Sequence, residues 1–277
     1  MNKVKFMKMH GAGNDFVLVD DRSETFPVHD HLRLAALAAA RTGIGCEGVI
    51  LVQNSTRADF RMLFFNPDGT EADLCGNGAR CVAAFAREIG AAKGAAMTFE
   101  TSAGLVDAEV VSERHVKVWM PEPKGRRYGI NVCGHSGDFI IAGVPHFVVS
   151  CDNVASVDVA GEGRKLRLSD EFAPDGANID FVKYTSPNRA TIRTYERGVE
   201  AESGACGTGA VAAAIVGVEC KGMSLPMRIR TAQGFDLVVD GDWRRSKTTG
   251  FTLSGPVKKV FEGEIDIDAL DVSCEME

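Results

Sequence analysis

Two segments of the sequence share one pattern: Leu74-Cys75-Gly76-Asn77-Gly78-Ala79-Arg80 and Ala205-Cys206-Gly207-Thr208-Gly209-Ala210-Val211. In each, a cysteine precedes two glycines that flank a short polar residue, and an alanine-rich run of helical composition follows. Each cysteine is therefore predicted to stand at a helix N-terminus, where the helix dipole and the first N–H groups stabilise a thiolate and lower the thiol pKa. The pattern constrains the fold because it requires two similar loop-to-helix junctions, one in each half of the chain.

Further repeats indicate that the two halves are related. Gly13-Asn14-Asp15-Phe16 resembles Ala177-Asn178-Ile179-Asp180-Phe181, and Thr101-Ser102-Ala103-Gly104 resembles Thr231-Ala232-Gln233-Gly234. We predict two homologous α+β halves, residues 1–122 carrying Cys75 and residues 123–277 carrying Cys206, with the last strand as a candidate to pack on the first half. A rough twofold between them would bring the two cysteine-capped helices toward a common cleft.

Strands predominate in the pattern of apolar residues. Three segments have helical composition: 31–41, 79–89 and 209–216. The last of them is almost entirely apolar, which predicts that Cys206 lies deep in the protein. Alternating or β-branched segments predict strands at 4–9, 16–20, 49–53, 60–65, 115–120, 147–151, 179–184, 191–195 and 227–230.

Composition excludes several classes of protein. The net charge of −7 is not that of a nucleic-acid-binding domain, and we find no basic stripe. The apolar stretches are too short for a membrane span, and the first ten residues alternate as a strand does, so we predict a cytoplasmic protein with free thiols. No metal is predicted, because none of the eight cysteines has the paired spacing of a zinc site.

Two thiols in matching settings suit a reaction that needs an acid and a base on opposite faces of one carbon. Removing the α-proton of an amino acid from one face and returning a proton on the other inverts that centre. A thiol and a thiolate can exchange these roles, and helix N-termini can hold the substrate carboxylate. We expect no cofactor, since no lysine stands in a setting that indicates a Schiff base.

These residues resemble a known family. Lys8-Met9-His10-Gly11-Ala12-Gly13-Asn14-Asp15-Phe16, the block from Asn66 to Cys81, and Tyr195-Glu196-Arg197-Gly198 followed by Ala205 to Ala210 are similar to diaminopimelate epimerase over nearly the whole chain. The resemblance implies an α+β fold of two pseudo-symmetric halves, each a β-barrel-like sheet around a central helix. It also implies a homodimer that interconverts LL- and meso-diaminopimelate without a cofactor, on the route to lysine and peptidoglycan.

The resemblance also implies roles for individual residues. Cys75 and Cys206 would be the acid/base thiols, and His146 and Glu196 would be polar neighbours that assist proton exchange. The substrate would be held by these residues: Asn14, Asn66, Gly76, Asn77, Asn178, Glu196, Arg197, Gly207 and Thr208. Two segments depart from the pattern, since Val144 replaces an asparagine common in relatives and Glu202-Ser203-Gly204 replaces a bulkier Glu-Thr-Leu.

Other interpretations stay open at this stage. His146 also fits a buried core histidine, Asn14 and Asn178 fit turns, and Glu196 with Arg197 fits a solvated pair. The other six cysteines are predicted to be small buried hydrophobes: Cys46, Cys81, Cys133, Cys151, Cys220 and Cys274. As a whole, the chain also fits a two-thiol racemase of another amino acid, of the proline or histidine type, or a non-catalytic member of the fold that binds a small acid.

Overall fold

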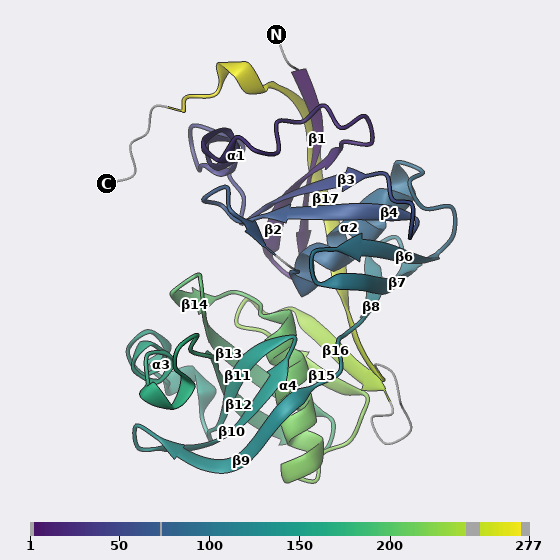
Figure 1. Ribbon diagram of the computed structural model, residues 1–277. Coiled ribbons are helices and arrows are strands. Elements are labelled where there is room, and N and C mark those ends of the chain that lie inside the picture. Colours follow the sequence, from purple (N-terminus) through teal and green to yellow (C-terminus); the bar gives the residue numbers. More distant parts are fainter. Residues whose placement is uncertain (1–2, 73, 242–249, 273–277) are drawn as a thin grey trace. The chain divides into compact units, whose positions relative to one another are not determined.

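The computed structural model describes residues 3–72, 74–241 and 250–272 (Figure 1). The chain forms two compact units by its internal contacts. Unit 1 comprises residues 1–118 and 257–277, and unit 2 comprises residues 119–256. The chain thus leaves unit 1 once and returns to it near its end. The boundary expected at residue 122 between homologous halves stays a prediction.

Unit 1 is a strongly curved sheet around one helix. Its helices are α1 (His31–Ala38), α2 (Gly76–Glu88) and the short η3 (Ile267–Ala269). Its strands are β1 (Lys3–Gly11), β2 (Asn14–Asp20), β3 (Val49–Gln53), β4 (Phe60–Phe65), β5 (Glu71–Ala72), β6 (Ala96–Thr101), β7 (Gly104–Ser112) and β8 (His115–Trp119). Strand β17 (Phe251–Asp266) pairs with both β1 and β8 and so closes the sheet into a barrel.

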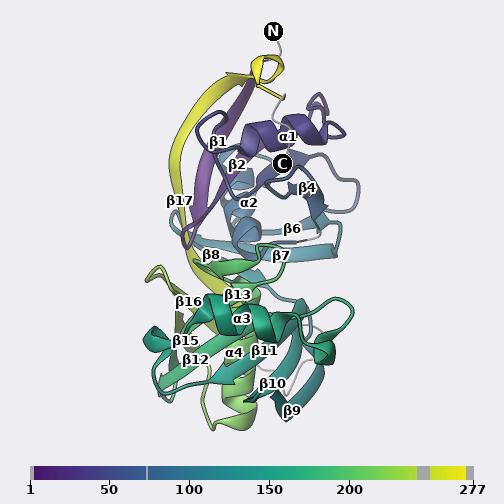
Figure 2. The same cartoon turned by 90° about the vertical axis from the view of Figure 1, so that its left-hand side faces the viewer.

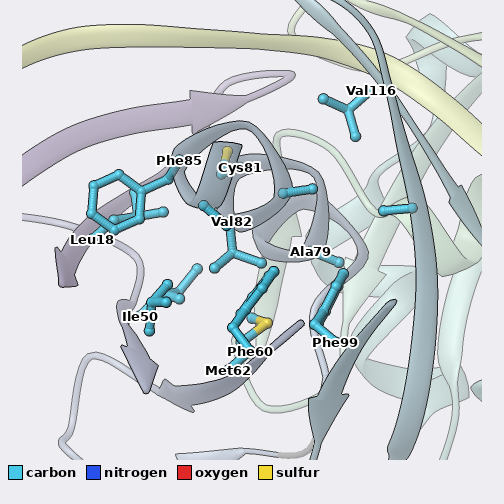
Figure 3. Packing of buried hydrophobic residues seen from close by; sticks show 14 of the residues in the cluster. Leu18, Ile50, Phe60, Met62, Ala79, Cys81, Val82, Phe85, Phe99 and Val116 are labelled. Carbon is cyan, nitrogen blue, oxygen red and sulfur yellow. The ribbon is translucent and has the colours of Figure 1, made fainter. Parts of the chain in front are cut away.

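Helix α2 lies inside this barrel, and most of its residues, many of them small, are buried. It packs against β1, β2, β3, β4 and β7. Figure 3 shows Val82 of the helix among side chains from the surrounding strands, including Ile50 and Phe60. Gly78 permits this close approach, since a Cβ there would stand 3.1 Å from Ile50 Cδ1. The barrel core therefore fixes where the N-terminus of α2 emerges.

Unit 2 has a second curved sheet around a second buried helix. Its helices are α3 (Val159–Arg167), α4 (Gly207–Cys220), η1 (Val154–Ser156) and η2 (Asp170–Phe172). Its further strands are β9 (Lys124–Val132), β10 (His135–Ala142), β11 (Val144–Ser150), β12 (Asn178–Ser186), β13 (Arg189–Glu196), β14 (Ala201–Ser203), β15 (Met227–Arg230) and β16 (Asp236–Gly241). Helix α4 packs against β10, β11, β12, β13, β15 and β16, and Figure 2 shows it beside β11 and β12.

The two units share one order of connections. In unit 1 a hairpin, β1–β2, is followed by a helix, a strand parallel to β2, its antiparallel neighbour and then α2. In unit 2 the hairpin β10–β11 is followed in the same way by α3, β12, β13 and α4. The predicted fold class, α+β with two pseudo-symmetric halves, is confirmed.

The register of the repeat predicted from short motifs is wrong. Strand β2 begins at Asn14 and corresponds to β11, which begins at Val144. Asn178 begins β12, which corresponds to β3. Both Asn14 and Asn178 begin a strand ahead of apolar residues, and this shared local setting produced the misleading match.

The predicted strands all fall on observed strands, but the helices differ at their ends. Helices α2 and α4 begin earlier than their alanine-rich runs, at Gly76 and Gly207, and α1 ends at Ala38. The prediction missed α3, whose polar composition hides its amphipathic character. It also missed β7 and β9, which are partly exposed and carry charged residues, as well as the largely buried β10 and the long β17.

Candidate active site

Cys75 stands at the N-terminus of α2, as the sequence predicted. It is the N-cap residue, with extended backbone at φ −121° and ψ 123°, and it is half-buried. Its thiol lies 3.5 Å from Asn14 Oδ1, and Asn77 Nδ2 donates to the same oxygen at 3.1 Å. The β1–β2 hairpin brings Asn14 here through a two-residue turn in which Ala12 and Gly13 both have positive φ.

Asn14 is held in a polar cluster at the end of this hairpin. Its Nδ2 donates to Glu47 Oε2, so its Oδ1 is directed to Cys75 and Asn77. Glu47 in turn donates its backbone N–H to Asp15 Oδ1 at 3.1 Å. Asn14 is thus placed by side-chain bonds that reach beyond its own turn.

Arg80 lies fully buried one turn into α2. Its Nη2 donates to Asn77 Oδ1 at 2.6 Å and its Nη1 to Gly76 O at 3.2 Å, while its Nε has no hydrogen-bond partner among the residues that the structure describes. Burial lowers the pKa of Arg80 to about 10, and the nearby Cys81 and Cys75 oppose that shift. A buried cation therefore lies close to the Cys75 thiol.

Asn66 is the one predicted unit 1 residue that the structure ties to its own turn. Its Nδ2 donates to Thr70 Oγ1 at 3.1 Å, and its backbone N–H donates to Thr70 O at 2.8 Å. Its side chain is half-buried. A role in substrate binding stays a prediction for this residue.

Cys206 is the N-cap of α4, with φ −101° and ψ 111°, and only 5% of it is exposed. Its sulfur accepts from Gly209 N at 3.4 Å and lies 3.4 Å from Thr208 Oγ1. This confirms the predicted depth of the second cysteine. Helix geometry leaves the first N–H groups of α2 and α4 without intrahelical acceptors, so both helix ends favour an anion.

The expected fall in the thiol pKa does not hold for Cys206. Burial raises its pKa well above the ordinary value, and the charges of Glu196 and Asp180 raise it further. The Thr208 and Gly209 hydrogen bonds act in the opposite direction but are the smaller influences. Burial and these two carboxylates thus favour the neutral thiol at Cys206.

His146 lies behind the end of α4 in a fully buried polar network. Its Nδ1 lies 2.7 Å from Asp180 Oδ2, and both side chains are 0% exposed. Thr194 Oγ1 donates to Asp180 Oδ1 at 2.7 Å. These three residues come from the neighbouring strands β11, β12 and β13. Asp180 pairs with Thr194 of β13, and on its other side it pairs with Val148 of β11, two residues after His146.

Asn178 links this network to the end of β13. Its Nδ2 lies 3.4 Å from His146 Nε2, and its Oδ1 accepts from the backbone N–H of Arg197 at 2.7 Å. Glu196 and Arg197 are half-buried, and Arg197 Nη1 donates to Asp175 O at 3.5 Å. Five of the predicted unit 2 residues thus belong to one continuous region: His146, Asn178, Glu196, Arg197 and Cys206.

Sequence reasoning missed Asp180 and Thr194 as parts of the site. The available signal was a carboxylate inside an apolar strand, since a buried Asp requires partners. Of the cysteines predicted to be buried, Cys81 is buried, Cys46 and Cys151 are half-buried, and Cys133 and Cys220 are exposed. Cys274 lies outside the described residues.

Within the described part of the chain, no group of three or more His, Cys, Asp or Glu residues is placed to hold a metal ion. No described helix is long and apolar enough to cross a membrane.

Comparison with known sequences gives relatives along nearly the whole chain. The diaminopimelate epimerase from Aquifex aeolicus (strain VF5) is 41% identical, and the match covers 97% of this chain and 100% of the relative. The diaminopimelate epimerase from Chlorobaculum tepidum is 38% identical over 94% of this chain and 100% of the relative.

Solved structures resemble the fold at lower identity. A phenazine biosynthesis protein of the PhzF family from Bacillus anthracis has a TM-score of 0.72 at 20% identity, covering 96% of this chain and 100% of that one. A probable proline racemase from Agrobacterium radiobacter K84 has a TM-score of 0.69 at 18% identity, covering 97% and 94%. These two similarities concern the fold alone.

The sequence model of the diaminopimelate epimerase family matches residues 6–125 and 139–250. This match includes both cysteine-capped helices, α2 and α4, and every predicted site residue. Together with full-length relatives of up to 41% identity, it confirms the resemblance drawn from the motifs. The chain belongs to the diaminopimelate epimerase family.

Proposed function

We propose that this protein is an isomerase that interconverts LL- and meso-diaminopimelate by a two-base mechanism with Cys75 and Cys206. The observation that carries the proposal is the matched placement of the two cysteines. Each is the N-cap of the central helix in one of two similarly connected units. The curated relatives that cover the chain bear the name diaminopimelate epimerase.

The proposed reaction needs one thiolate and one thiol. The thiolate removes the α-proton, and the thiol delivers a proton to the opposite face of the resulting carbanion, after which the two cysteines have exchanged protonation states. The structure supports Cys206 as the thiol in the resting enzyme, because burial and the neighbouring carboxylates raise its pKa. The buried cation Arg80 near Cys75 supports Cys75 as the thiolate.

The remaining roles follow from the chemistry of each group. The first-turn N–H groups at Gly76, Asn77, Gly207 and Thr208 would bind the reacting carboxylate and stabilise the charge that develops on it. Arg197 would bind the distal carboxylate, for which a guanidinium offers two parallel donors. Polar side chains would complete the distal site and assist the thiols: Asn14, Asn66, Asn178, His146 and Glu196.

The biological setting belongs to the proposal as well. We propose that the enzyme works in the cytoplasm, as a homodimer, in the synthesis of lysine and of peptidoglycan precursors. The net charge of −7 and the cysteine content support an intracellular setting. We propose no cofactor, because two thiols are sufficient to carry the proton in both directions.

The decisive experiment is incubation with LL-diaminopimelate in deuterated water without added cofactor. We expect meso product with deuterium at one α-carbon, since the returned proton comes from a solvent-exchanged thiol. Proline and histidine, offered separately, serve as the control substrates. Faster racemisation of either one than of diaminopimelate would favour the alternative racemase, and absence of exchange with all three would favour a non-catalytic binding protein.

A further inference from the structure

Asp180 is a fully buried carboxylate whose charge helps to raise the pKa of Cys206, but whose hydrogen bonds are made to other groups. It lies on β12 under the first turn of α4, where a Cβ at Gly209 would stand 2.5 Å from Asp180 Oδ1. An acid in such a place is expensive to bury unless both oxygens have donors. Its two partners, Thr194 and His146, meet this requirement.

We infer that Asp180 is a positioning residue, which holds His146 in the Nδ1–H tautomer and through it sets the orientation of Asn178 and the backbone of Arg197. The inference rests on the proposed function only for its effect on substrate binding. The tautomer and the hydrogen-bond polarity stand on the contacts alone.

The polarity of the network is fixed at the Arg197 end. A backbone N–H can only donate, so the Asn178 atom that faces Arg197 N at 2.7 Å is the carbonyl oxygen. The amide nitrogen of Asn178 therefore faces His146 Nε2 at 3.4 Å, and an amide nitrogen can only donate. His146 Nε2 must accept, which places the ring proton on Nδ1.

The same polarity follows from the Asp180 end. Asp180 Oδ2 lies 2.7 Å from His146 Nδ1, and its Oδ1 accepts from Thr194 Oγ1. A carboxylate oxygen accepts hydrogen bonds, so the ring nitrogen that faces it, Nδ1, must carry the proton. The two ends agree, so one continuous chain of bonds runs from the Thr194 hydroxyl to the Arg197 backbone.

Removing Asp180 would reverse this chain. Without an acceptor at Nδ1, the proton is more stable on Nε2, where it opposes the Asn178 amide nitrogen. Asn178 then turns its oxygen to His146 and leaves the Arg197 N–H without its acceptor. The segment Glu196–Arg197 loses its anchor, although none of these groups has been mutated.

The first measurement uses the unmodified protein. Nitrogen NMR of ¹⁵N-histidine-labelled enzyme, with the His146 signals assigned by their loss in His146→Gln, reports which ring nitrogen carries the proton. We expect a proton on Nδ1 and a bare Nε2 near pH 8. A proton on Nε2 alone would overturn the inference, whether or not the protein turns over diaminopimelate.

A second variant, which keeps Asp180 in place, tests whether Asp180 holds the proton on His146 Nδ1. Asn178→Asp places a carboxylate opposite Nε2 in nearly the same shape. If Asp180 holds the Nδ1 proton, the ring gains a second proton on Nε2, and both ring nitrogens become protonated. A single proton moved to Nε2 would show that Asp180 does not hold the tautomer.

Steady-state kinetics of two variants, each with a buried carboxylate replaced, test the effect on substrate binding. Asp180→Leu should invert the His146 tautomer and raise the KM for diaminopimelate roughly tenfold, as expected for one lost hydrogen bond to a charged ligand. The control is Asp138→Asn, because Asp138 is 5% exposed in β10 of the same unit and accepts from Gly129 N outside the network. It should leave the tautomer and the KM unchanged.

The outcomes separate the two proposals. Folded Asp180→Leu with an unchanged tautomer and a KM within twofold of the unmodified protein would contradict the positioning role. Absence of epimerisation in the unmodified protein, with the Nδ1–H tautomer present, would contradict the proposed function and leave the network intact. If Asp180→Leu does not fold, the unmodified protein and Asn178→Asp still decide the question.

Discussion

The two units have the same connections, but the side chains beneath the N-termini of their central helices differ in polarity. In unit 1 the N-terminus of α2 rests on apolar side chains at three corresponding positions: Phe16, Ile50 and Phe64. In unit 2 the N-terminus of α4 rests on three polar ones: His146, Asp180 and Thr194. A duplicated fold thus keeps its packing layers while the buried residues diverge.

The buried charges differ in sign as well. Arg80 is fully buried in α2, and the corresponding position in α4 is the apolar Val211. Cys75 therefore has a cation as its buried neighbour, whereas Cys206 has the carboxylates of Asp180 and Glu196. The difference teaches that two similar helix ends can place the same side chain beside buried charges of opposite sign.

The largest expected effect tests whether the two halves are equally necessary. Cys75→Ala and Cys206→Ala should each reduce epimerisation by roughly 10³-fold, because each removes one proton carrier. Product formation from LL-diaminopimelate measures the loss. Cys81→Ala is the control, since Cys81 is buried in the core of α2 and should affect stability more than turnover. Near-normal turnover in either catalytic variant would refute the two-base scheme.

Arg80→Met tests the buried cation of unit 1. We expect kcat/KM to fall roughly tenfold to a hundredfold, by about 1.4–2.8 kcal/mol, because Cys75 loses a nearby positive charge. Stability should rise by about 1–3 kcal/mol, since an apolar side chain replaces a buried charge with an unpaired Nε. Denaturant unfolding and steady-state kinetics measure the two effects.

The pH dependence of the same variant gives a second reading. The pKa of Arg80 is about 10 in the folded protein, below its ordinary value of 12.5, so the unfolded chain binds more protons between these limits. The unmodified protein should therefore gain stability from this group as the pH rises above about 10, and Arg80→Met should lack that gain. An equal pH slope in both proteins would argue against a depressed pKa.

Glu196→Gln tests the carboxylates of unit 2. Removing this charge should lower the pKa of Cys206, and more thiolate means faster alkylation by iodoacetamide at pH 8. A shift of one unit would give roughly a tenfold rate increase. Peptide mass spectrometry measures the rate, with the exposed Cys133 of the same unit as the internal reference. An unchanged ratio of Cys206 to Cys133 labelling would show that Glu196 does not act on the thiol.

The smallest effect concerns Val144, which corresponds to Asn14 of unit 1. Val144→Asn restores an amide at the start of β11, and one added hydrogen bond should lower the KM about fivefold, within the usual 0.5–1.5 kcal/mol. The kcat should change little, as expected for a contact made equally in ground and transition states. A switch of preference to a smaller amino acid would show that Val144 defines a different substrate site.

Local sequence patterns carried much of the information about the fold. Glycines after each cysteine and alanine-rich runs predicted the two helix junctions, because only small residues permit the close approach seen at Gly78 and Gly209. The alternation of apolar and polar residues predicted the strands, because successive side chains of a strand point to opposite faces of the sheet. The family motifs then supplied the expected residues of the site.

Tertiary structure decided what these patterns could not express. The correspondence of Asn14 with Val144 depends on strand connections, the burial of Arg80 depends on the barrel that surrounds α2, and the raised pKa of Cys206 depends on carboxylates from other strands. The sequence by itself determined where two thiols meet two helix ends, since capping and helix formation are local. Only the folded chain decided the charge that each thiol faces, because burial and electrostatics depend on residues far apart in sequence.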